Sequence, residues 1–201
     1  MIDFFPVWSS TYEQDGNTYV FRNAKGTVDT DDKPQYERGI KIADYKERNE
    51  VTTRKLAIGK YHFSADVEFI TPIVFHAHRA TVFQIHDGCD DPGIPPSMLN
   101  IVNGHFNINS FPAIKDHNPV PAELKFNLKA DVEYTNNKSI NVDYYINHDY
   151  IGSTRRINCG DILYIKFGLY RIQGRCDIIQ KYTNVECIKL WLLKIANKIY
   201  T

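Results

Sequence analysis

The stretch Lys60-Tyr-His-Phe-Ser-Ala-Asp-Val-Glu-Phe-Ile70 alternates between apolar and polar side chains. The apolar residues occupy the odd positions from Tyr61 to Phe69, and His, Ser, Asp and Glu separate them. Successive side chains of a β-strand point to opposite faces of its sheet. The alternation therefore predicts a strand with one face in a core and the other toward solvent.

Comparable strand patterns recur along the chain, separated by turn signals such as Asn103-Gly104. The further predicted strands are residues 80–86, 98–102, 105–109, 139–146 and 162–171. The polar stretch 26–35 and the proline-rich stretches 91–96 and 112–121 are predicted to be loops, and the segment 187–200 a closing strand followed by a short helix. Ile, Val and Thr together number 47 against 10 Ala, which also favours strands. The sequence predicts an all-β fold, a sandwich or jelly roll of two packed antiparallel sheets.

The whole chain, residues 1–201, is predicted to form one domain, because no internal repeat and no long linker divides it. Lys and Arg total 24, as do Asp and Glu, so the formal net charge is zero. No global field then attracts nucleic acid or an anionic membrane surface. No apolar run approaches the roughly 20 residues that cross a bilayer. We expect no nucleic-acid partner and no membrane insertion.

The residues that commonly hold metals lack the spacing of a metal site. Cys89, Cys159, Cys176 and Cys187 form no C-x-x-C motif. Buried or unpaired thiols are the simplest interpretation, with a Cys176–Cys187 disulfide as the alternative. The pair His76 and His78, and the acidic positions Asp29, Asp31 and Asp32, have no convincing further ligands nearby in sequence. We expect no metal and no cofactor.

Three segments carry chemically capable side chains at every second position, opposite an apolar face. An exposed strand face is normally polar, so each segment alone is weak evidence of function. Together they supply a guanidinium, a carboxylate, an amide, an imidazole, an ammonium and phenols. These residues are Arg48, Glu50 and Thr52 in the first segment, Gln84 and His86 in the second, and Tyr164, Lys166 and Tyr170 in the third, where Gly168 leaves a gap.

The three segments resemble, in the same order, the signatures of jelly-roll polysaccharide lyases of the alginate lyase type, family seven. Arg48-Asn-Glu-Val-Thr52 is similar to R-x-E-L-R, Gln84-Ile-His86 to Q-I/V-H, and Tyr164-Ile-Lys-Phe-Gly-Leu-Tyr170 to Y-F-K-A-G-x-Y. Thr52, Phe167 and Arg171 depart from the alginate pattern, which has Arg, Ala and Asn there. The ending Gly168-Leu-Tyr-Arg171 and the pair Asn184-Val185 resemble the related heparin lyase and glucuronan lyase families. The resemblance implies a concanavalin A-like β-jelly roll.

The resemblance also implies a reaction, the β-elimination of a uronic-acid polysaccharide. Such lyases remove the C5 proton of a uronic acid and expel the 4-oxygen, which leaves an unsaturated sugar. Neutralising the neighbouring carboxylate stabilises the enolate-like intermediate. Gln84 and Arg48 are the candidates for this role, with Glu50 orienting Arg48.

A base must take the C5 proton, and an acid must protonate the leaving oxygen. By the resemblance Tyr170 is the acid, and either Tyr170 or His86 is the base. If Tyr170 is also the base, His86 instead contacts the carboxylate of the substrate. A free phenol has a pKa of about 10, so a basic tyrosine needs nearby cations, which Lys166 and Arg48 could provide.

Further substrate contacts are expected beside these catalytic candidates. The residues concerned are Lys166, Glu50, Tyr164, Arg171, Tyr145 and Asn147. Tyr145 and Asn147 share a face of a predicted strand end and could line a sugar groove, with packing as the equal alternative. Hydrolysis is disfavoured, because the E-x-D-x-x-E strand signature of sandwich-fold glycoside hydrolases is absent, with Asp66-Val-Glu68 as the nearest approach.

The rival function is a non-catalytic, lectin-like carbohydrate-binding jelly-roll module. Pure binding does not need an acid and a base beside a carboxylate clamp, so the enzyme is favoured. The expected partner is an acidic polysaccharide containing glucuronate rather than alginate, because Thr52 replaces the second Arg. We expect action on an extracellular or cell-surface glycan. The start of the chain lacks the pattern of a signal peptide, so a mature fragment, another export route and delivery by a virus or phage remain open.

Overall fold

A computed structural model of the chain describes residues 1–7, 12–23, 35–37, 40–43, 46–70, 80–86, 95–102, 104–109, 116–157, 160, 162–172 and 178–190. At 23, 35–37, 40–43, 46–48, 109, 116–118 and 171–172 only the backbone is described. The described residues form strands and turns without a helix, which confirms the all-β prediction. Accordingly, this part of the chain contains no helix with the length and apolarity needed to cross a membrane.

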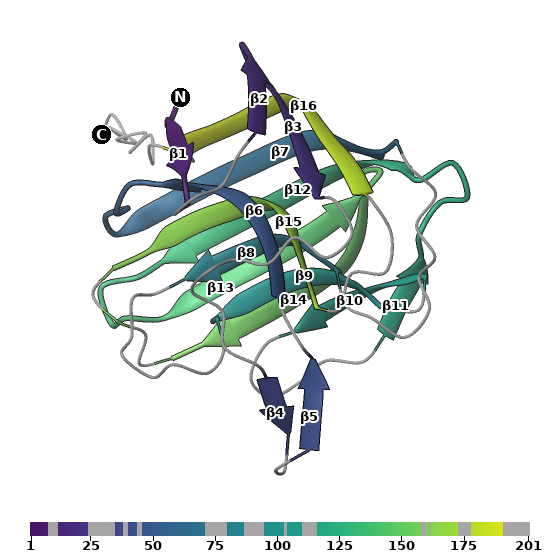
Figure 1. Cartoon of the computed structure of the whole chain (residues 1–201). Coiled ribbons are helices and arrows are strands. Elements are labelled where there is room, and N and C mark those ends of the chain that lie inside the picture. The colour runs from purple at the N-terminus through teal and green to yellow at the C-terminus, as the bar shows by residue number, and fades with distance from the viewer. Residues whose placement is uncertain are drawn as a thin grey trace, which may run out of the picture.

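Two seven-stranded antiparallel sheets pack face to face and form a β-sandwich (Figure 1). We call them the inner and the outer sheet. In spatial order, the inner sheet contains β1 (Phe4–Pro6), β6 (Lys46–Thr53), β15 (Tyr164–Ile172), β8 (Ala80–His86), β9 (Ser97–Val102), β10 (His105–Asn109) and β11 (Asp116–Pro119). The outer sheet contains β14 (Asp149–Arg156), β13 (Ile140–Ile146), β12 (Lys125–Tyr134), β7 (Gly59–Phe69), β16 (Ile178–Leu190), β3 (Thr18–Asn23) and β2 (Tyr12–Asp15).

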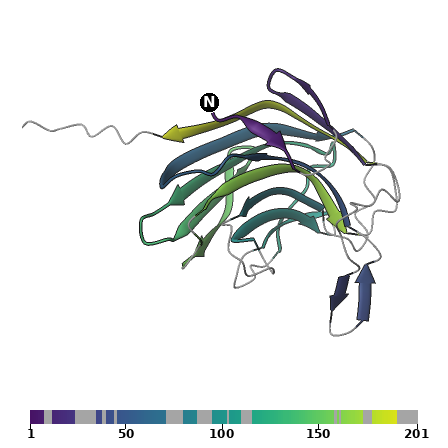
Figure 2. The ribbon, with the colours of Figure 1, turned by 60° about the vertical axis from the view of Figure 1, so that its left-hand side comes forward.

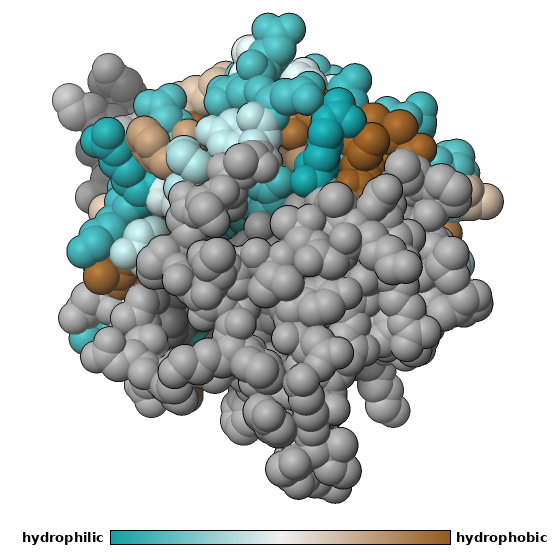
Figure 3. Space-filling view, viewed as in Figure 1, coloured by the Kyte–Doolittle hydropathy of each residue, from teal (hydrophilic) through white to brown (hydrophobic). Residues whose placement is uncertain are grey.

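Strands β6, β15 and β8 of the inner sheet are arched, and their hollow side faces away from the outer sheet (Figure 2). A separate hairpin of β4 (Gln35–Glu37) and β5 (Ile40–Ala43) pairs with neither sheet and projects from one end of the sandwich. The coloured surface over β1 to β3 is mainly hydrophilic, with a hydrophobic area beside one end of β16 (Figure 3). We call this concave side of the inner sheet the hollow face.

Most predicted strands are present with bounds shifted by at most two residues. These are β7, β8, β9, β10, β13 and β15, and β16 confirms the closing strand as far as Leu190. The expected helix after it lies outside the described residues, as do most of the predicted loops 26–35 and 91–96. The prediction that 112–121 is entirely loop is wrong, because β11 pairs with β10 there. It is an edge strand, where proline is tolerated since only one side of the ladder must be paired.

The core lies between the sheets and follows the predicted alternation. Tyr61, Phe63, Ala65, Val67 and Phe69 are all buried, while the intervening side chains of β7 lie on the outer surface and remain half-buried. Three hydroxyl groups inside the sandwich pair across it: the hydroxyls of Ser97 and Tyr144 are 2.6 Å apart, and Thr154 donates to Ser97 at 2.9 Å. The two sheets are therefore joined by both apolar packing and hydrogen bonds.

Cys187 is a free thiol in the core, so its predicted alternative pairing with Cys176 is wrong. Burial raises the pKa of this thiol to about 12, from an ordinary value of 9.0. The buried thiol thus favours folding below pH 9, and this contribution is lost as the pH rises toward 12. Since the thiolate is the reactive form, we expect Cys187 to resist alkylation at pH 8 until the chain is unfolded. Peptide mass spectrometry after labelling checks this, and rapid labelling of the folded chain would contradict the burial.

Candidate active site

Strand β15 is the centre of the site, because it lies between β6 and β8. Its alternate residues Ile165, Phe167 and Leu169, and Leu163 just before it, are fully buried in the core. Strand geometry then turns the residues between them toward the hollow face. Those residues are Tyr164, Lys166, Gly168 and Tyr170, as the sequence predicts.

The antiparallel register brings the three segments of the motif resemblance side by side. Across the β6–β15 ladder, the Cα atoms of Arg48, Glu50 and Thr52 face those of Tyr170, Gly168 and Lys166 respectively. Across the β15–β8 ladder, Tyr164 faces His86 and Lys166 faces Gln84. Directly opposite residues on one face are close enough for their side chains to interact. The three segments, of which the first and last are more than a hundred residues apart in sequence, therefore form one contiguous surface.

Three of these side chains are joined in a hydrogen-bonded chain. Gln84 Nε2 donates to Glu50 Oε1, and Gln84 Oε1 lies 2.8 Å from His86 Nε2. Glu50 and Gln84 are 1% and 3% exposed. An ionised carboxylate only accepts hydrogen bonds, so Glu50 holds the amide nitrogen of Gln84 toward itself and the amide oxygen toward His86. His86 Nε2 must then carry a proton, which leaves Nδ1 as the nitrogen with the lone pair in neutral His86.

Gly168 is the residue that lets Glu50 come this close. A Cβ atom at Gly168 would lie 2.5 Å from the carbonyl oxygen of Asn49 and 2.7 Å from the Cα of Glu50. Its φ angle is +135°, a conformation that favours glycine. The gap predicted between the phenols and the amine of β15 is thus filled by the backbone of β6.

Tyr182 supports the site from below, which no pattern in the sequence indicates. Its hydroxyl lies 2.7 Å from the carbonyl oxygen of Val82 and 3.1 Å from that of Gly168. The β15–β8 register shifts at this point, between Phe167 and Tyr170, and such a bulge leaves ladder groups in need of other partners. Tyr182 itself is in the core, where burial raises its pKa well above the ordinary value. Only the pairing of β16 with β7 in the opposite sheet reveals this contact.

Phe167, one departure from the family pattern, points into the core. Its ring centroid is 4.8 Å from those of Phe4 and Tyr182 and 5.4 Å from that of Phe63. An aromatic cluster of this kind favours edge-to-face and tilted packing. The large side chain at this position therefore packs in the core between the sheets and does not occupy the hollow face.

Two predicted substrate contacts lie elsewhere. Tyr145 belongs to β13 of the outer sheet, where Lys129 Nζ lies 4.6 Å from its ring centroid and Tyr150 packs against it. Asn147 lies in the following turn with φ +51°, and its Oδ1 accepts from the backbone N–H of Asn127 at 2.8 Å. The structure does not bring these two residues to the hollow face, because β13 belongs to the opposite sheet. For Arg48 and Arg171 the backbone alone is described.

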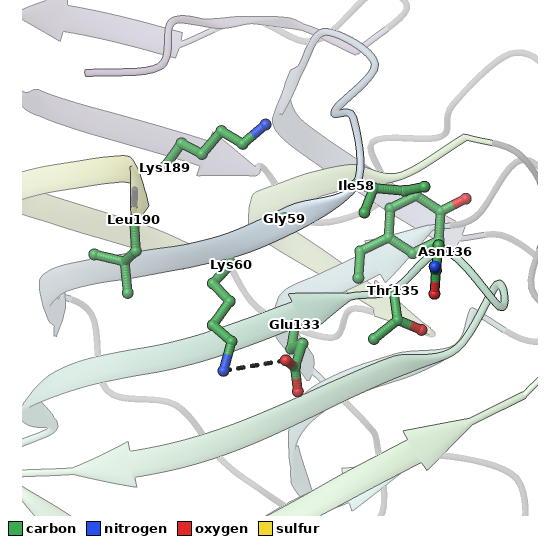
Figure 4. A pocket seen from close by; sticks show the side chains of 9 residues that line it. Ile58, Gly59, Lys60, Glu133, Thr135, Asn136, Lys189 and Leu190 are labelled. Atoms are coloured by element: carbon green, nitrogen blue, oxygen red, sulfur yellow. Dashed lines mark ion pairs between the residues drawn. The ribbon is translucent and has the colours of Figure 1, made fainter. Parts of the chain in front are cut away.

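The outer face of the outer sheet carries matched charges. Lys60 and Glu133 are 3.1 Å apart beside an open cavity of about 480 Å³ (Figure 4). The hydrogen bond from Lys60 lowers the pKa of Glu133 below its ordinary value. The cavity is lined by Ile58, Gly59, Lys60, Glu133, Tyr134, Thr135, Asn136, Lys189 and Leu190, none of them a predicted site residue.

No group of three or more metal-ligating side chains lies close together within the described residues. The two motifs that were considered as metal sites, His76 with His78 and Asp29 to Asp32, lie outside the described residues.

Comparison with known proteins shows the same architecture. No protein-family model matches the chain, and no curated protein sequence matches it. Among solved structures, the alginate lyase AlgAT5 of polysaccharide lyase family 7 superposes with a TM-score of 0.59 at 18% identity, over 92% of this chain and 84% of that one. An alginate lyase from Pseudomonas aeruginosa gives 0.59 at 13% identity, over 92% and 88%. An endo-β-1,4-glucuronan lyase from the fungus Trichoderma reesei gives 0.56 at 9% identity, over 94% and 87%. The chain therefore has the β-jelly-roll fold of the alginate lyases and the glucuronan lyase that it resembles.

Proposed function

We propose that this protein is a polysaccharide lyase that cleaves a uronic-acid-containing polysaccharide by β-elimination. The observation that carries the proposal is the convergence of all three motif segments on adjacent strands β6, β15 and β8. Packing alone does not require chemically capable residues at matched register on the face opposite the core. The likeness in fold to alginate and glucuronan lyases supports the same reaction class.

The proposed reaction begins at the substrate carboxylate. Of the two Nε2 hydrogens of Gln84, one is donated to Glu50, so the other can be donated to the carboxylate. Arg48 supplies positive charge from its register position opposite Tyr170. Together they stabilise the negative charge that develops when the C5 proton leaves. Glu50 acts as a positioning residue, since its hydrogen bond fixes the amide of Gln84.

Elimination then needs one proton taken and one proton given. Tyr170 or His86 removes the C5 proton, and the C5–H electron pair forms the C4=C5 double bond. The bond from C4 to the glycosidic oxygen breaks, and Tyr170 protonates that oxygen. The side chains of Lys166 and Tyr164 lie on the same face and, with Arg171, are proposed to bind the sugar chain. The proposed mechanism requires no cofactor.

We propose glucuronate-containing polymers as the substrate rather than alginate. Thr52 occupies the register position opposite Lys166 where the alginate pattern has a second Arg, and its hydroxyl donates to the carbonyl of Thr53 at 3.2 Å. The site then has one cationic side chain fewer than the alginate pattern for binding the carboxylates of the substrate. The glucuronan lyase from Trichoderma reesei shares the fold at a similar TM-score to the alginate lyases.

The test is the ultraviolet absorbance of an unsaturated uronide, followed while the protein is incubated with glucuronan, hyaluronan, heparan sulfate, chondroitin and alginate. We expect a steady rise with a glucuronate-containing polymer, because elimination creates a double bond conjugated to the carboxylate. A rise with alginate alone would contradict the substrate class. Binding of a polymer with no rise for any of them would replace the lyase with the lectin-like module.

A further inference from the structure

The side-chain amide of Asn100 is on the hollow-face side of β9, and its nitrogen has no hydrogen-bond partner in the described part of the chain. Leu99 and Ile101 on either side of it are in the core, so strand alternation turns Asn100 the other way. Thr81 Oγ1 donates to Asn100 Oδ1 at 2.6 Å. The Nδ2 atom has no hydrogen-bond partner among the residues that the structure describes, although Asn100 is 0% exposed. A buried donor without an acceptor destabilises a fold and calls for an explanation.

The register places this amide in line with Tyr170. Thr81 faces Tyr170 across the β15–β8 ladder, and Asn100 faces Thr81 across the β8–β9 ladder. Asn107 of β10 continues the same row. Two strand spacings, about 10 Å, separate Asn100 from Tyr170. That span is about twice the length of one sugar unit, so in a polymer lying along the row the sugar at Asn100 is one or two units away from the sugar at Tyr170.

The two other unpaired side-chain amide atoms do not face this surface. Asn49 Oδ1 and Gln180 Oε1 are also buried without a hydrogen-bond partner in the described part of the chain. Asn49 points into the sandwich, where its Nδ2 donates to the carbonyl of Arg22, and Gln180 donates to Tyr182 inside the core. A ligand on the hollow face cannot reach either of them.

We propose that Asn100 is a sugar-binding residue, whose Nδ2 donates a hydrogen bond to an oxygen of a sugar unit one or two places along the polymer from the one that is cleaved. The inference rests on the proposed function for the position of the cleaved unit. The acceptor is a hydroxyl or carboxylate oxygen, since both accept from a neutral amide. Asn100 is 0% exposed in the structure, so the proposed hydrogen bond requires this position to become accessible when the sugar binds.

The test compares binding of uronate oligosaccharides by calorimetry in a Tyr170→Phe background, where no cleavage interferes. The double variant Thr81→Val/Asn100→Leu replaces both hydrogen-bond partners with apolar groups of similar shape, which is nearly neutral for folding. We expect its Kd to rise about 2- to 13-fold, the usual effect of losing one uncharged hydrogen bond. Thr81→Val alone keeps the amide and is expected to stay within about twofold. Asn141→Leu, on the outer sheet, is the matched control.

With Tyr170 intact, the double variant should raise KM and leave kcat unchanged, because the contact is made to a sugar that does not react. An unchanged Kd, or a fall in kcat at unchanged KM, would overturn the role of Asn100. If the wild-type chain binds the oligosaccharides but releases no unsaturated product, the lyase proposal fails, and the ratio of Kd values still decides Asn100. If it binds none of them, both proposals fail.

Discussion

Replacing Tyr170 with phenylalanine is expected to lower kcat about 100- to 10,000-fold, the range typical of a lost general acid or base. The phenol is the one group of the site that the proposed mechanism uses to protonate the leaving oxygen. Tyr170 is 7% exposed, and the substitution removes a single oxygen atom, so the fold and KM should change little. The measurement is the initial rate of the absorbance rise on the cleaved polymer, with circular dichroism to verify folding.

Tyr145→Phe is the matched control, because it removes the same oxygen from a tyrosine on the outer sheet. It should retain the full rate. The variant His86→Ala tests which residue is the base. If His86 takes the C5 proton, the kcat of His86→Ala falls as far as that of Tyr170→Phe. If Tyr170 has both roles, His86→Ala mainly raises KM through the loss of a partner at the carboxylate. Wild-type turnover by Tyr170→Phe would refute the mechanism.

Gly168→Ala is expected to destabilise the protein by at least about 3 kcal/mol, within the range of substitutions that force a backbone clash. The new Cβ would lie 2.5 Å from the carbonyl oxygen of Asn49, an atom that cannot turn aside as a flexible side chain would. Strands β6 and β15 would have to separate at the position where Glu50 reaches Gln84. We therefore expect activity to fall together with stability, as measured by urea denaturation and by the initial rate.

Gly104→Ala is the control for this clash. Gly104 has φ +74°, also unfavourable for alanine, but a Cβ there meets nothing within 4 Å. Its expected cost is about 1 kcal/mol, from backbone strain alone. Equal effects of the two substitutions would mean that the close approach of β6 and β15 is not important for stability.

Local pattern in the sequence predicted the individual strands of the site well. The alternation in 162–171 predicted both the buried face of β15 and its polar face, and Gln84 with His86 shared a face as expected. The same pattern could not tell to which sheet a strand belongs. Tyr145 has a strand pattern as clear as that of Tyr164, yet it lies on the outer sheet. Pairing between strands that are distant in sequence decides to which sheet each strand belongs.

The sequence by itself determined that this chain is an all-β sandwich and which side chains line each strand, because side-chain direction in a strand has a period of two residues. It also identified the motif residues that the proposed lyase uses. Only the tertiary structure decided that Glu50 holds the amide of Gln84, that Tyr182 supports the bulge beside Gly168, and that Asn100 lies in line with Tyr170. The physical reason is that each of these relations depends on the register of paired strands and on the packing of the two sheets. No local pattern of residues encodes either one.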